Sequence, residues 1–164
     1  MINSTLCYIE KNGCFLMLFR NKKINYPCEG KWVGIGGKFE PGEDADQCLL
    51  REVWEETGLK LTDYHFHGIV HFVSNELEDE DMYLYSSDDF EPEDTEAAKI
   101  FHETGDCPLP VCSEGMLSWV PEEEVLGLPM WEGDRAFVSK LMSGAGHISM
   151  RLQYTGEHCK ITEE

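Results

Sequence analysis

The sequence predicts a mixed α/β (α+β) sandwich that forms one domain over residues 1–164. Short apolar runs of strand length recur along the chain, and two longer segments repeat apolar residues at helical spacing. Glycine, proline and asparagine turn signals separate these segments. The chain is long enough to bury one hydrophobic core, and 41% apolar with 27% charged residues is typical of a globular protein.

The expected strands are apolar runs bounded by turn residues. In chain order they are 6–9, 14–19, 32–35, 67–73, 82–85, 116–120, 148–154 and 159–162. Asn12-Gly13 lies between the first two runs, and Asn-Gly in that position is the strongest short signal for a hairpin. Gly156 lies between the last two runs, which predicts a closing hairpin.

Two principal helices are expected between these strands. Asp44 or Asp46 can cap the first helix, which continues to about Thr57, where Gly58 supplies a left-handed stop. The second helix covers 131–142, with apolar residues at helical spacing.

The remaining segments are predicted to be less regular. Residues 20–30 read as a polar loop, and 75–81 as an acidic turn without the ligand pattern of an EF-hand. Residues 88–113 form an acidic, loop-like excursion with a short helical turn at 96–102. Residues 121–125 begin like a helix, because a proline precedes several acids.

Charge and cysteine content limit the function classes. A formal charge of −19 argues against binding to a nucleic-acid duplex, which requires clustered lysine and arginine. No apolar run is long enough for a membrane span, and the N-terminus does not resemble a signal peptide. Seven cysteines without a CxxC pair favour reduced thiols and a cytoplasmic location. Both a monomer and a homodimer remain open.

Three glutamates cluster within the first helix. Glu52, Glu55 and Glu56 stand at i, i+3 and i+4, so their like charges destabilise the helix unless a positive group neutralises them. A hard divalent cation with oxygen ligands is the natural candidate. On a helical projection Glu52 and Glu56 share a face with Leu49, which makes a purely solvated face the poorer explanation.

Salt bridges within the segment are the competing explanation. Arg51 can reach Glu55 four residues on, and Glu43 in the preceding loop can pair with Arg51. These pairs do not neutralise Glu52 and Glu56, for which Lys38 and Lys60 are the only nearby cations in the sequence.

The run 37–59 resembles the Nudix box, Gly-x5-Glu-x7-Arg-Glu-aliphatic-x-Glu-Glu-x-Gly-aliphatic, at every specified position. The resemblance implies a Nudix-type α/β/α sandwich with a mixed β-sheet. It also implies hydrolysis of a nucleoside diphosphate linked to another group, with Mg²⁺ or Mn²⁺ as cofactor.

The box positions imply roles for individual residues. Glu52, Glu55 and Glu56 match the metal-ligating glutamates, and Glu52 also matches a position proposed as general base in some members. Gly37 would contribute its carbonyl, although a Gly-Gly pair such as Gly36-Gly37 also occurs in simple tight turns. The catalytic set implied by the box is Glu52, Glu56, Arg51 and Glu43, of which the last two orient the others.

Two flanking segments, 30–38 and 128–134, look like the MutT-related 8-oxo-dGTP diphosphatase group. That resemblance implies that Trp131 stacks on a purine and that Asp134 reads its hydrogen-bonding edge. The alternative is a core tryptophan at a helix start and an ordinary first-turn acid.

Four other positions bear on the substrate and the metal. Trp32 and Lys38 are expected to contact the substrate, whereas Val33 replaces a purine-reading asparagine of one branch. Glu114 aligns with a fourth acidic metal ligand in relatives, but it could equally be a surface residue.

The sequence therefore predicts a Mg²⁺-dependent diphosphatase for a small-molecule nucleotide. The expected reaction converts 8-oxo-dGTP to 8-oxo-dGMP and pyrophosphate, which sanitises the nucleotide pool. The alternatives are a Nudix hydrolase for ADP-ribose, a nucleotide sugar or capped RNA, and a non-catalytic nucleotide sensor.

Overall fold

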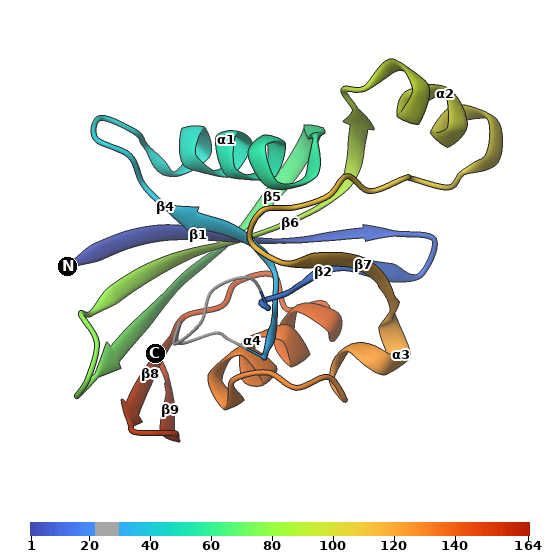
Figure 1. Ribbon diagram of the computed structural model, residues 1–164. Coiled ribbons are helices and arrows are strands. Elements are labelled where there is room, and N and C mark those ends of the chain that lie inside the picture. Colours follow the sequence, from blue (N-terminus) through green and yellow to red (C-terminus); the bar gives the residue numbers. More distant parts are fainter. Residues whose placement is uncertain (22–29) are drawn as a thin grey trace.

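A computed structural model describes residues 1–21 and 30–164 (Figure 1). The expected loop at 20–30 therefore lies mostly outside the described residues. The strands are β1 (Ile2–Lys11), β2 (Cys14–Phe19), β3 (Trp32–Val33), β4 (Ile35–Lys38), β5 (Leu59–Ser74), β6 (Glu80–Pro92), β7 (Met116–Pro121), β8 (Met150–Thr155) and β9 (His158–Glu163). The helices are α1 (Ala45–Thr57), α2 (Thr95–Thr104), α3 (Glu122–Val125) and α4 (Glu132–Met142).

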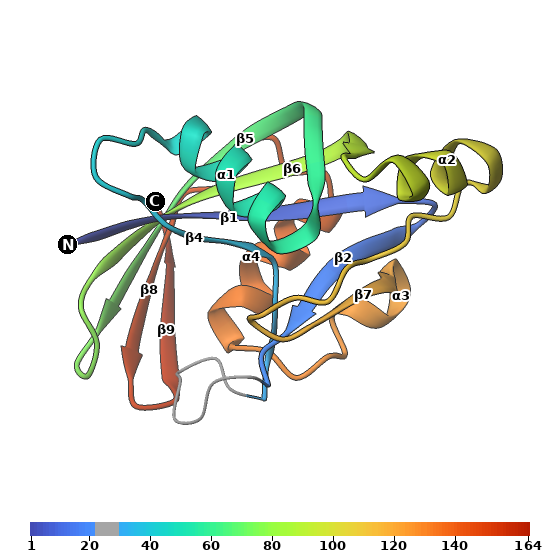
Figure 2. The same cartoon turned by 45° about the horizontal axis from the view of Figure 1, so that its top comes forward.

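The described strands form one mixed sheet, which confirms the predicted fold class. Its order is β3-β2-β1-β6-β5-β8-β9, with β4 paired to β1 and β7 paired to β2. The central pair β1 and β6 is parallel, as is the pair β5 and β8. Helix α1 covers one face of this sheet, and α3 and α4 cover the other (Figures 1 and 2).

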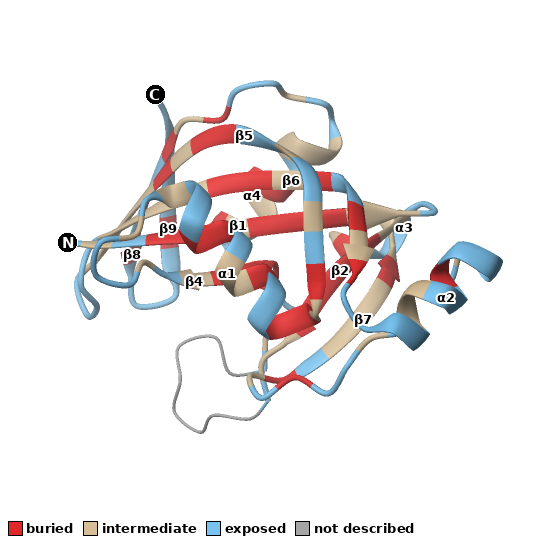
Figure 3. Cartoon of the chain, turned by 90° about the horizontal axis from the view of Figure 1, so that it is seen from above, coloured by how far each residue is buried: buried red, intermediate tan, exposed pale blue. Residues whose placement is uncertain are grey.

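The hydrophobic core has two halves, one on each side of the sheet. Leu49 and Val53 of α1 pack on one half, and Phe137 and Val138 of α4 pack on the other. Buried stretches run along the central strands, while α2 lies at the periphery and is largely exposed (Figure 3). Alternate residues of each central strand point to opposite halves, so the two faces can carry different chemistry.

Helix α1 has the start and stop that the sequence predicts. The Asp44 carboxylate accepts a hydrogen bond from the Gln47 N–H at 2.8 Å, and the Gln47 side chain accepts one from the Asp44 N–H at 3.0 Å. This reciprocal pair is a capping box. Gly58 ends the helix at φ 70°, a left-handed conformation that glycine adopts without strain.

Both predicted hairpins are present. In the first, Lys11 pairs with Cys14, and Asn12 and Gly13 both have positive φ in the turn between them. Such a turn suits the twist of the flanking strands. The closing hairpin joins β8 to β9 through Gly156 at φ 60°.

Several elements differ from their predicted extent. Strand β5 begins directly after α1, and β6 continues to Pro92, so the expected excursion at 88–113 begins inside a strand. The β5–β6 pair contains register shifts, and bulges of this kind break the alternation by which a strand is recognised. Helix α2 has 10 residues where a short helical turn was expected. The expected strand at 32–35 is interrupted at Gly34.

The described cysteines are all free thiols, in agreement with the sequence: Cys7, Cys14, Cys48, Cys107, Cys112 and Cys159. Cys28 lies outside the described residues. Among the described helices, none has the length and apolar character needed to cross a lipid bilayer.

Candidate functional site

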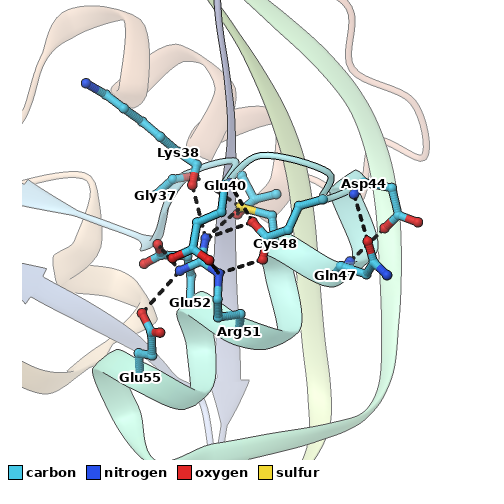
Figure 4. A network of polar contacts seen from close by, with 11 residues as sticks. Gly37, Lys38, Glu40, Asp44, Gln47, Cys48, Arg51, Glu52 and Glu55 are labelled. Carbon is cyan, nitrogen blue, oxygen red and sulfur yellow. Dashed lines mark hydrogen bonds and ion pairs between the residues drawn. The ribbon is translucent and has the colours of Figure 1, made fainter.

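Arg51 is the centre of the polar network on α1 (Figure 4). Its guanidinium donates to both oxygens of Glu43, at 2.6 and 2.9 Å, as the sequence predicts. It also donates to Glu52 at 2.8 Å, to Glu55 at 3.1 Å and to the carbonyl of Lys38 at 3.1 Å. The expectation that Glu52 has only lysines as nearby cations is therefore wrong. The planar fork of one arginine serves three carboxylates at once.

The electrostatic environments of these carboxylates differ. The hydrogen bonds from Arg51 lower the pKa of Glu43 to about 2. Burial raises the pKa of Glu52, although the same arginine opposes that shift. Glu43 therefore serves as a permanent anion that holds the arginine in place, whereas Glu52 is less well compensated.

Glu56 is the most deeply buried of the box glutamates, at 8% exposed. Burial raises its pKa to about 8, against the charge of Arg20 and a hydrogen bond from the backbone of Gly36. Its Oε2 atom has no hydrogen-bond partner within the described residues. A buried oxygen without a partner is costly, so this atom indicates a ligand site.

Arg20 approaches this site from the end of β2. It donates to Glu114 at 2.8 Å, across 94 residues of sequence. The structure thus brings Glu114 into the neighbourhood of Glu56, where its charge contributes to the raised pKa of that group. The sequence separation explains why residue patterns alone could not pair Arg20 with either acid.

Gly36 and Gly37 lie within β4, so the tight-turn explanation for this pair is wrong. A Cβ atom at Gly36 would lie 1.9 Å from the carbonyl oxygen of Thr5 on β1. A Cβ at Gly37 would lie 2.6 Å from the carboxylate of Glu52. The two glycines therefore permit β4 to approach both its neighbouring strand and the helix that carries the glutamates.

A cavity of about 430 Å³ opens beside β4 on the α4 face of the sheet. Its wall includes Gly37 and Lys38 from the box and Trp131 and Asp134 from α4 and its N-cap. The structure thus brings together the two segments that the sequence linked to a nucleotide, some 90 residues apart. Trp32 lies elsewhere: it packs on the ring of Phe19 with centroids 5.2 Å apart.

Trp131 and Asp134 have distinct surroundings in this cavity. The Trp131 ring meets Tyr154 edge to face at 5.3 Å, and the Nζ atom of Lys31 lies 4.7 Å from its centre. Trp131 packs against the core and also lines the cavity, so its stacking on a purine stays a prediction. Burial, with the charge of Glu80, raises the pKa of Asp134 to about 7.

The family follows from comparison with known proteins. The sequence profile of the NUDIX domain matches residues 3–141. The chain belongs to the Nudix family. As a Nudix hydrolase it acts on phosphoric anhydrides, and members of the family typically use a divalent metal ion.

Individual relatives agree with this assignment. The chain is 26% identical to the uncharacterized Nudix hydrolase YvcI of Bacillus subtilis over 160 residues, 93% of this chain and 87% of the relative. It is 38% identical over 97 residues to the oxidized purine nucleoside triphosphate hydrolase of Danio rerio, 58% of this chain and 60% of the relative. The fold resembles the mutator MutT protein of Bacillus halodurans with a TM-score of 0.77 at 24% identity, covering 98% and 97% of the two chains.

The site fits a divalent ion by donor type, although its ligands are not gathered. Across residues 1–21 and 30–164, no three acidic, histidine or cysteine side chains converge into a ready-made metal site. Arg51 contacts three of the box glutamates instead, Glu43, Glu52 and Glu55. The carboxylates and the Gly37 carbonyl are the hard oxygen donors that Mg²⁺ prefers. The buried Oε2 atom of Glu56 has no hydrogen-bond partner within the described residues, which fits a metal ligand.

The cavity residues that sequence patterns missed include Ser4, Phe72, Glu80 and Tyr154. Ser4 and Glu80 could have been found from alternation, because each lies two residues from an apolar residue of the same sheet face. Tyr154 follows the same rule, because it lies two residues from the buried Leu152 in β8.

Asp134→Asn should change the pH dependence of stability. Because folding raises the pKa of Asp134 from 3.8 to about 7, the folded state binds more protons than the unfolded state between these values. Wild-type stability should therefore fall, relative to Asp134→Asn, as the pH rises from 4 to 7. Urea unfolding at pH 4, 5.5 and 7 measures this difference. The exposed Asp106→Asn is the control, and an identical trend in both variants would contradict the assignment.

Tyr154→Phe should lower both the stability of the fold and the affinity of the cavity for a nucleotide. The Tyr154 hydroxyl accepts a hydrogen bond from the Gly133 N–H at 2.9 Å, and its loss should lower the free energy of unfolding by about 1–2 kcal/mol. Because this tyrosine also supports Trp131, the KM for a nucleotide substrate should rise. Tyr85→Phe is a matched control, since it loses a hydrogen bond to Asp46 on the other face. An equal change of KM in both variants would refute a specific role.

Proposed function

We propose that this chain acts as a single domain over residues 1–164 and hydrolyses oxidised purine nucleoside triphosphates, converting 8-oxo-dGTP to 8-oxo-dGMP and pyrophosphate. The observation that carries the proposal is the shared cavity of Trp131, Asp134, Gly37 and Lys38. An aromatic ring and a hydrogen-bonding acid stand there beside the segment expected to hold a pyrophosphate. The 38% sequence identity over 97 residues to an oxidized purine nucleoside triphosphate hydrolase supports this substrate class.

The proposed metal site uses the acids of the Nudix box. Glu52, Glu55, Glu56, the Gly37 carbonyl and Glu114 would hold Mg²⁺ or Mn²⁺. The ion supplies neutralisation of the charge that develops on the phosphate oxygens, which is the main requirement of phosphoryl transfer. Glu52 or Glu56 is then placed to accept the proton of the attacking water. Arg51 and Glu43 keep the carboxylates in position through the hydrogen bonds described above.

The proposed base site lies on the other side of β4. Trp131 offers a ring for stacking at the wall of the cavity, and Phe72 from β5 contributes a second apolar surface. Asp134 provides the polar contact that orients the base. Lys38, exposed at the end of β4, is placed to contact a phosphate. Trp32 packs against the same core cluster as Trp131 and would stabilise the position of that ring.

Glu56→Gln should abolish turnover while leaving the protein folded. Mutation of the outer partners of metal ligands already costs about 10- to 100-fold in activity, so loss of a ligand should cost more than about a hundredfold. Stability should not fall, because Oε2 of Glu56 has no hydrogen bond within the described residues that the variant could lose. Release of pyrophosphate from 8-oxo-dGTP with Mg²⁺ measures activity, and thermal unfolding measures stability.

Glu103→Gln on the peripheral helix α2 is the control for this variant, since it changes the same functional group at an exposed position. Undiminished turnover of Glu56→Gln would refute the metal assignment.

A substrate panel tests the choice of nucleotide. We expect kcat/KM for 8-oxo-dGTP to exceed that for dGTP, ADP-ribose, a nucleotide sugar and a capped RNA by at least about tenfold. Equal or better turnover of any other member would refute the proposed substrate but not the Nudix chemistry. Tight nucleotide binding without phosphate release would instead indicate a sensor.

A further inference from the structure

Glu80 lies on the cavity side of the sheet, although its sequence context is an acidic turn. It is the first residue of β6 and pairs with Ile2 of β1 on one side and Phe72 of β5 on the other. Glu80 and Met82, two residues on, both line the cavity. A carboxylate therefore stands among the residues that would surround the base.

The position of this carboxylate is fixed by the neighbouring strand. The hydroxyl of Ser4, which is only 5% exposed, donates a hydrogen bond to Oε2 of Glu80 at 2.7 Å. Glu80 lines the cavity, and this hydrogen bond engages only one of its two carboxylate oxygens. Among the other acids of the cavity wall, Glu78 is directed elsewhere, since it pairs with the N-terminal amine at 3.3 Å and its side chain is 61% exposed.

Asp134 approaches the same cavity from the opposite layer. It stands in the first turn of α4, and the negative charge of Glu80 contributes to the raised pKa of its carboxyl. Burial disfavours the ionised form of Asp134, so with a pKa of about 7 this carboxyl can keep its proton near neutral pH beside Glu80. The pair then presents one O–H donor together with carboxylate acceptors.

We propose that Glu80 is a specificity residue, and that with Asp134 it selects purines with a guanine-type edge over purines with an adenine-type edge. A guanine edge offers a carbonyl acceptor followed by two N–H donors, which matches one O–H donor and two acceptors. An adenine edge offers one amino donor and one acceptor, which leaves one of the two acceptor oxygens unmatched. A polar group that is left without a hydrogen bond in a closed site makes binding of that substrate much weaker. This inference rests on the proposed purine nucleotide substrate and names which purines it includes.

The test compares 8-oxo-dGTP with 8-oxo-dATP, which share the triphosphate and the oxidised ring but differ at this edge. The wild-type enzyme should have the higher kcat/KM for 8-oxo-dGTP. In Glu80→Gln this preference should fall about tenfold or more, because a hydrogen bond to a charged group is lost. Glu78→Gln is the matched control: it removes the same charge from the cavity mouth and should change both substrates by the same factor.

Each outcome decides the proposal. If Glu80→Gln changes both substrates by one factor, as Glu78→Gln does, the role of Glu80 is refuted while the proposed function stands. If the wild type hydrolyses neither purine, the proposed function itself fails and the inference fails with it. Should Glu80→Gln not fold, Ser4→Ala releases the same carboxylate and should lower the preference in the same direction. An unchanged preference in Ser4→Ala would then overturn the proposal.

Discussion

The crowding of carboxylates against the backbone of β4 is the constraint on which the rest of this structure depends. Helix α1 carries three glutamates, and Glu43 lies just before it, so the segment would repel itself without compensation. Arg51 provides that compensation with a single guanidinium that binds Glu43, Glu52 and Glu55. The helix therefore keeps its charges close together and directed toward β4.

The glycines of β4 make room for these carboxylates on the strand that α1 packs against. Because Gly36 and Gly37 have no side chains, the strand lies against Thr5 and leaves space for the carboxylate of Glu52. The strand also forms part of the cavity wall, on the opposite face from α1. One short strand thus connects the acids that act on a phosphate to the cavity that we assign to a base. A nucleotide must extend across this strand to use both.

Local chemistry made part of this arrangement predictable. Helix α1 was recognised because its cap at Asp44, its stop at Gly58 and its apolar face all lie within a few residues of one another. Contacts across the sequence were not predictable. Nothing near Glu56 in the chain indicates that Arg20 lies beside it, and the acidic run at 78–81 hides the start of β6 at Glu80.

Hydrogen bonding distinguishes the acid that holds the site in place, Glu43, from the acid that we assign to the metal, Glu56. The Glu43 side chain is 13% exposed and both of its oxygens accept hydrogen bonds from Arg51, so it adds stability to the site. Glu56 is buried and keeps an oxygen without a partner, so it costs stability for as long as no ligand binds. Such a cost is expected where a protein prepares a binding site in advance. The unpartnered Oε2 atom of Glu56, rather than the density of charge on α1, is therefore the feature that most directly argues for a bound cation.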